Sequence, residues 1–140
     1  MRARLSFAWA AGLFTILIVL PSQARSQCIG EQAANDKIAE LHAKNHALSL
    51  KESPLLQGVR DAARREDQNA VNSLCPSLIA VEQDLMGNLQ ESAAAKKNAT
   101  ICYGASRVKD LDPPDYESVL ITKSQMVINT CRESVTTPSK

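Results

Sequence analysis

Apolar residues recur along this chain at steps of three and four, the spacing of one face of an α-helix. Between residues 29 and 50 they are separated by Glu, Lys, Asn and Gln, and they are Ala34, Ile38, Leu41 and Leu48. No stretch alternates apolar and polar residues for long enough to favour a strand. The pattern predicts an all-α fold, a small bundle of three to five helices whose first helix covers residues 29–50.

Two signals predict where further helices begin. Ser53-Pro54 combines an N-cap residue with a proline in the first turn, so we expect a second helix from this point. Asp67 offers another N-cap, and the apolar residues after it keep one helical phase: Val71, Leu74, Leu78, Val81, Leu85 and Leu89. This phase passes through Pro76, so it allows either one kinked helix or two helices that break at Cys75-Pro76. We expect a kink or short break there, and fraying between residues 93 and 103.

The last helix is expected to follow the paired prolines within residues 109–117, with Asp112 as its N-cap. Its inner face is predicted to consist of Tyr116, Val119, Leu120, Lys123, Val127 and Cys131. Lys123 belongs to this set because a lysine stem can pack while its ammonium group reaches water. From about residue 134 we expect a short disordered tail.

The N-terminus has the pattern of a cleavable signal peptide. Two arginines precede the uncharged segment Leu5 to Leu20, whose 16 residues would span roughly 24 Å as a helix, less than the roughly 30 Å of a membrane core. Small residues then favour cleavage after Ala24 or, failing that, after Ser26. A lipoprotein cut before Cys28 and an uncleaved anchor are the less favoured alternatives. We therefore expect a signal peptide at residues 1–24 and a secreted or periplasmic location.

The mature chain, a single predicted domain at residues 25–140, differs in composition from the full sequence. It has no Phe or Trp, and loss of Arg2 and Arg4 leaves 14 of the 16 basic residues against 15 acidic ones. A near-neutral chain without stacking aromatics is a poor nucleic-acid binder. No later apolar run approaches spanning length. We therefore expect neither nucleic acid nor a membrane as a partner after cleavage.

Four cysteines, Cys28, Cys75, Cys102 and Cys131, lie in the mature chain, and an even number in a short exported protein indicates two disulfides. Their spacing contains no CxxC motif of redox or zinc sites. A bridge between Cys75 and Cys102 is least favoured, because the helix between them would hold them tens of ångströms apart. Of the two pairings that remain, Cys28–Cys102 with Cys75–Cys131 is preferred to Cys28–Cys75 with Cys102–Cys131.

His42 and His46 are the only histidines, and they lie four residues apart on the first predicted helix. This spacing allows two imidazoles to share one metal ion. Relative to the apolar face of the helix, both border the core and face water. The residues between them do not form an HExxH motif, and the sequence identifies no further ligand. Weak binding of a transition metal by this pair is therefore the alternative function.

The sequence contains no recognisable catalytic motif. Serine-nucleophile motifs, a P-loop and GxGxxG are missing, and an enzyme would need carboxylates such as Glu40, Glu82 and Asp84 to converge from different helices. We expect no enzyme activity and no cofactor. The predicted function is that of an exported non-enzymatic binding, interaction or structural protein of the cell envelope or periplasm, with a protein or peptide as partner. An apolar groove for a peptide, another subunit or a lipid is expected along Leu85, Met86 and Leu89.

Overall fold

The computed structural model describes residues 28–109, 112–113 and 115–136, and within these ranges the chain forms helices and no strand. Three α-helices follow one another, α1 at Glu31–Arg64, α2 at Gln68–Tyr103 and α3 at Tyr116–Thr136, with a short 3-10 helix η1 at Ala105–Arg107. The all-α prediction is confirmed, and three helices lie within the predicted range. α3 includes residues 134–136, which the sequence placed in a disordered tail. The predicted signal peptide, residues 1–24, lies outside the described residues.

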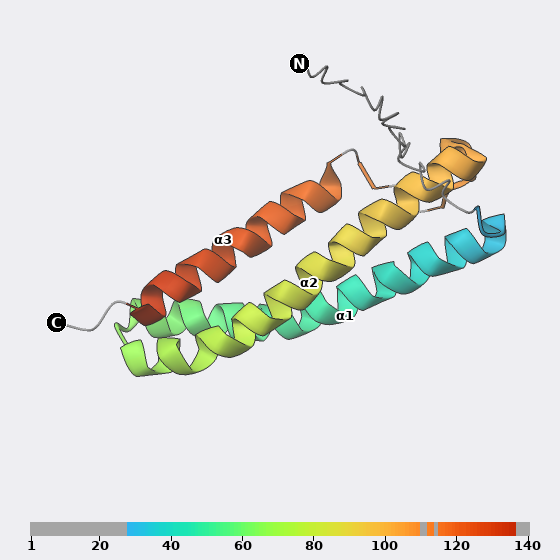
Figure 1. Cartoon of the computed structure of the whole chain (residues 1–140). Coiled ribbons are helices and arrows are strands. Elements are labelled where there is room, and N and C mark those ends of the chain that lie inside the picture. The colour runs from blue at the N-terminus through green and yellow to red at the C-terminus, as the bar shows by residue number, and fades with distance from the viewer. Residues whose placement is uncertain (1–27, 110–111, 114, 137–140) are drawn as a thin grey trace, which may run out of the picture.

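α2 is the central element of the fold (Figure 1). α1 and α2 form a long antiparallel hairpin, and α3 returns along α2, so that α1 and α3 run in the same direction (Figure 1). Both outer helices pack on α2. Among the described helices, none combines the length and the apolar character needed to cross a membrane.

The turn between α1 and α2 is short because Asp67 caps α2. Its side chain accepts a hydrogen bond from the backbone N–H of Ala70 at 3.0 Å. Its own backbone N–H donates to the carbonyl of Ala62, which closes the turn against the end of α1. Glu66, directly before the cap, has a φ of 55°, a left-handed conformation typical of tight chain reversals. The predicted N-cap at Asp67 is confirmed.

Pro54, expected to begin a helix, lies inside one instead, and at Pro76, where a kinked helix and a break were both allowed, the helix is continuous. Pro54 is within α1 and Pro76 within α2, so the first two predicted helices are one helix, and α2 continues through Cys75-Pro76. A proline inside a helix costs about 3 kcal/mol, because it removes a backbone hydrogen bond and crowds the preceding turn. Both prolines are exposed, and it is the residues around them that pack, in an apolar cluster of Ala62, Val71, Cys75, Leu78 and Cys131 against which Leu55, Leu56 and Val59 lie. Packing of the flanking residues therefore offsets the cost.

One disulfide lies toward each end of the bundle. Cys28–Cys102 joins the segment before α1 to the last turn of α2, and Cys75–Cys131 joins α2 to α3. The Cα atoms are 5.8 Å apart in the first bridge and 5.4 Å in the second, within the usual range. The preferred pairing is confirmed and its alternative is wrong. Because Cys75 and Cys131 are buried, their bridge is part of the core between α2 and α3.

α3 is rotated about its axis relative to the prediction. Ser124 and Cys131 are on its buried side, whereas Tyr116 is 42% exposed and Val119 is 64% exposed. The predicted inner face is therefore wrong for Tyr116 and Val119. The physical reason is that α3 packs mainly on α2, and the residues it buries there are Ser124, Ile128 and Cys131.

Candidate binding groove

A groove runs between α1 and α3, with α2 as its floor. It consists of two cavities, which both include Lys123 in their lining. The first, which we call the histidine cavity, has a volume of about 640 Å³ and contains both histidines in its wall. The second, the turn cavity, has a volume of about 800 Å³ and lies beside the α1–α2 turn. The side chains of the turn cavity are mostly apolar and include Leu56, Val59, Val71, Leu78, Met126 and Val127.

The histidine cavity has a largely polar wall and an apolar floor. Its α1 wall includes two small residues, Ala39 and Ala43, and five polar ones: His42, Asn45, His46, Ser49 and Glu52. Leu85 and Leu89 of α2 form the floor, and Leu120 of α3 adds to it. Two of the three residues predicted for an apolar groove are therefore here. Met86 is not, because it lines a separate hollow of about 240 Å³ on another side of α2 and α3.

An ion pair crosses the groove between its two cavities. The ammonium Nζ of Lys123 on α3 donates a hydrogen bond to Oε1 of Glu52 on α1 at 3.2 Å. The Glu52 side chain is only 8% exposed, whereas that of Lys123 is 50% exposed. The carboxylate therefore lies inside the bundle and the ammonium faces the groove.

A second acid, Glu82 of α2, is buried close to this ion pair. Its exposed fraction is 1%, and neither carboxylate oxygen has a hydrogen-bond partner among the described residues. Burial raises the pKa of Glu82 above its usual value, and the neighbouring Glu52 carboxylate adds to the shift, while Ser124 and Lys123 oppose it. One acid from α1 and one from α2 thus meet a hydroxyl and a cation from α3.

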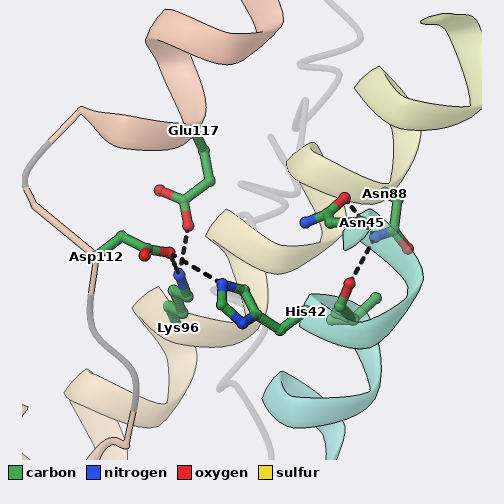
Figure 2. A network of polar contacts seen from close by, with 7 residues as sticks. His42, Asn45, Asn88, Lys96, Asp112 and Glu117 are labelled. Atoms are coloured by element: carbon green, nitrogen blue, oxygen red, sulfur yellow. Dashed lines mark hydrogen bonds and ion pairs between the residues drawn. The ribbon is translucent and has the colours of Figure 1, made fainter. Parts of the chain in front are cut away.

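The histidines lie in the wall of the cavity, as two neighbouring groups on α1. His42 reaches toward the segment before α3, where its Nε2 is 3.9 Å from Oδ2 of Asp112 (Figure 2). Asp112 also accepts a hydrogen bond from the buried ammonium of Lys96, which donates to Glu117 at 2.7 Å (Figure 2). The prediction that Asp112 caps the last helix is wrong, because that helix begins only at Tyr116 and the Asp112 carboxylate contacts Lys96 instead.

These groups do not form a metal centre in the described part of the chain. No set of three or more His, Cys, Asp or Glu side chains there is arranged to hold a metal ion. His42 has an acidic neighbour in Asp112, but that carboxylate is engaged by Lys96. The convergence of Glu40, Glu82 and Asp84 that an enzyme would need is also not seen, since Glu82 is buried while the other two are exposed.

A buried asparagine holds α1 on α2 beside the histidine cavity. The Asn88 side-chain amide donates to the backbone carbonyl of Leu41 at 2.9 Å and to Oδ1 of Asn45 at 2.7 Å (Figure 2). Asn88 is only 2% exposed. Because Asn45 is in the cavity wall, these bonds set the position of that wall relative to the floor.

Sequence reasoning did not assign Glu52, Ser124 or Asn88 to a site. A usable signal was present, since Glu52 lies four residues after the buried Leu48 and Glu82 lies four residues after the buried Leu78. A polar residue that continues an apolar phase is a candidate for burial. The pattern does not show which of these polar residues contact one another between helices.

Comparison of the chain with protein-family models, with characterised proteins and with solved structures gave no significant match to any of them. The groove is therefore interpreted from its own geometry and chemistry.

Proposed function

We propose that this protein is an exported, non-enzymatic binding protein of the cell envelope or periplasm, and that its ligand occupies the groove between α1 and α3. The observation that carries this proposal is the histidine cavity. Its volume of about 640 Å³ falls within the roughly 300–1,000 Å³ of ligand sites, and it combines an apolar floor with a few polar groups, as such sites do. Two disulfides support the exported location, because such bonds persist in oxidising compartments.

The groove can be tested by filling the histidine cavity with a large side chain. Ala43 lines this cavity, whereas Ala47, one turn further along α1, is exposed and lies outside every cavity described above. Ala43→Trp and Ala47→Trp are therefore a matched pair, with the same substitution on the same helix. Each variant and the wild-type protein would be used to capture material from the native envelope fraction, with mass spectrometry of both proteins and small molecules.

We expect a ligand that wild type and Ala47→Trp retain and that Ala43→Trp loses. Equal retention by both variants, or no retained ligand at all, would contradict the proposal. Circular dichroism on both variants shows whether a loss of binding reflects the cavity or the fold.

Metal binding by His42 and His46 is the alternative that the same experiment distinguishes. Both imidazoles line one cavity, but the described residues supply no third ligand. A transition metal that co-purifies with wild type and is lost in a His42→Ala, His46→Ala double variant would favour this alternative.

A further inference from the structure

The ion pair between Glu52 and Lys123 determines which ligands suit the histidine cavity. It links α1 to α3 across the groove, at the point where the two cavities meet. A helix lying along the whole groove would have to displace this link. The cavity is therefore better suited to a small molecule than to a helical peptide.

Lys123 is the exposed member of this ion pair. Both residues line the cavity, but the Lys123 side chain is 50% exposed and that of Glu52 only 8%, and the ammonium donates a single hydrogen bond, to Glu52, among the described residues. An ammonium group has three N–H donors, so Lys123 retains donors for a ligand. Ser49, exposed on α1, lies in the same lining and provides a hydroxyl group.

Acidic side chains lie next to the opposite end of the cavity, at His42. Asp112 and Glu117 are not in the cavity lining, but Asp112 is 3.9 Å from His42, and both carboxylates share the single cation Lys96. Between the two ends lies the apolar floor of Leu85 and Leu89. A carboxylate finds an ammonium donor only at the Lys123 end, and the acids beside His42 disfavour the reverse orientation.

We propose that the histidine cavity binds an anionic amphiphile, with its carboxylate head group on Lys123 and its alkyl tail along Leu85 and Leu89. This inference rests on the proposed function and names the chemical class of the ligand. Charge complementarity at Lys123 selects the head group, and burial of the tail against the leucines provides the hydrophobic contribution.

Decanoate and decanol are suitable probes, because they share an alkyl chain and differ in charge. Their affinities for the oxidised mature protein would be measured by calorimetry below their aggregation concentrations. We expect decanoate to bind about tenfold more tightly than decanol, since only the carboxylate forms a charge-assisted hydrogen bond.

Two substitutions should act in opposite directions. Lys123→Gln should weaken decanoate binding by about three- to tenfold, whereas Glu52→Gln should strengthen it by a similar factor, because it removes the carboxylate that competes for Lys123. Both variants lose the same ion pair, so a purely structural effect would move both affinities in the same direction. Lys97→Gln is the matched control, because Lys97 is exposed on α2 and lies outside the cavity.

Equal affinity for decanoate and decanol, no binding of decanoate, or weaker binding in both variants would overturn this inference. Other results distinguish failure of this ligand class from failure of the proposed function. Capture of a peptide or a neutral molecule that Ala43→Trp abolishes would leave the proposed function intact and overturn only the ligand class. Unchanged decanoate binding by Ala43→Trp would show that the histidine cavity is not the site and would overturn both.

Discussion

Lys96 of α2 donates a hydrogen bond of 2.7 Å to Glu117 of α3, and its side chain is only 8% exposed. The same ammonium contacts Asp112, in the segment that leads into α3. Burial alone would lower the pKa of Lys96, but the hydrogen bonds to Asp112 and Glu117 outweigh it and raise the pKa. One cation thus ties the start of α3 to α2, at the acidic end of the histidine cavity.

Removing this cation should destabilise the fold. In Lys96→Met the stem still packs, but two partly buried carboxylates face each other without a cation. We expect the free energy of unfolding at pH 7 to fall by about 3 kcal/mol. Urea denaturation would measure this, with Lys97→Met at the neighbouring exposed position as control. Equal midpoints for the two variants would show that the cluster does not stabilise the protein.

The same cluster predicts a pH dependence at the alkaline end. Because the pKa of Lys96 is raised in the folded state, its contribution is complete below the pKa of an unfolded lysine, about 10.4, and is lost as pH rises through the folded pKa. Wild type should therefore lose stability at high pH more steeply than Lys96→Met.

Glu82→Gln should stabilise the protein at neutral pH. The raised pKa of Glu82 means that the folded state binds its proton more tightly than the unfolded state, so this group destabilises the fold as pH rises above about 4. The neutral amide avoids this cost, and we expect a gain of about 1 kcal/mol or more at pH 7 that disappears toward pH 4.

Urea midpoints between pH 4 and pH 8 would measure this difference. Asp84→Asn is the control, because Asp84 is exposed on the same helix. A Glu82→Gln variant that is less stable than wild type at pH 7 would mean that the ionised carboxylate is well solvated or paired.

The two disulfides should contribute unequally. We expect Cys75→Ala with Cys131→Ala to lower the free energy of unfolding by about 3–5 kcal/mol, because it opens a long loop and also removes two buried side chains. Cys28→Ala with Cys102→Ala opens a loop of similar length, but Cys28 is exposed, so the loss should be nearer 2–3 kcal/mol. Urea denaturation of both double variants would measure the two losses of free energy. A larger loss without Cys28–Cys102 than without Cys75–Cys131 would contradict the prediction.

The export proposal predicts the N-terminal residue of the natural protein and the oxidation state of its cysteines. Protein recovered from the compartment outside the inner membrane should begin at Arg25, or at Gln27 if cleavage follows Ser26, with all four cysteines oxidised. Intact mass and N-terminal sequencing after non-reducing alkylation would show this. A retained Met1, or four alkylated thiols, would rule out the export proposal.

The sequence by itself determined the helical class, the Asp67 cap and the preferred cysteine pairing. The first two follow from local periodicity and from the chemistry of a capping side chain. Distance along one helix disfavoured Cys75–Cys102, and the choice between the remaining two pairings was a preference that the structure confirms. It misjudged Pro54 as a helix start and left two alternatives open at Pro76. Tertiary packing of the surrounding leucines and valines outweighs the local cost of proline in a helix at both positions.

Only the tertiary structure decided that Glu52, Glu82, Lys123 and Ser124 meet. The phase of each helix can mark such a residue for burial, but their meeting depends on how far α3 is rotated and on the groove left between α1 and α3. Rotation about a helix axis is set by packing against the neighbouring helix, a long-range interaction that no local pattern in one sequence reports.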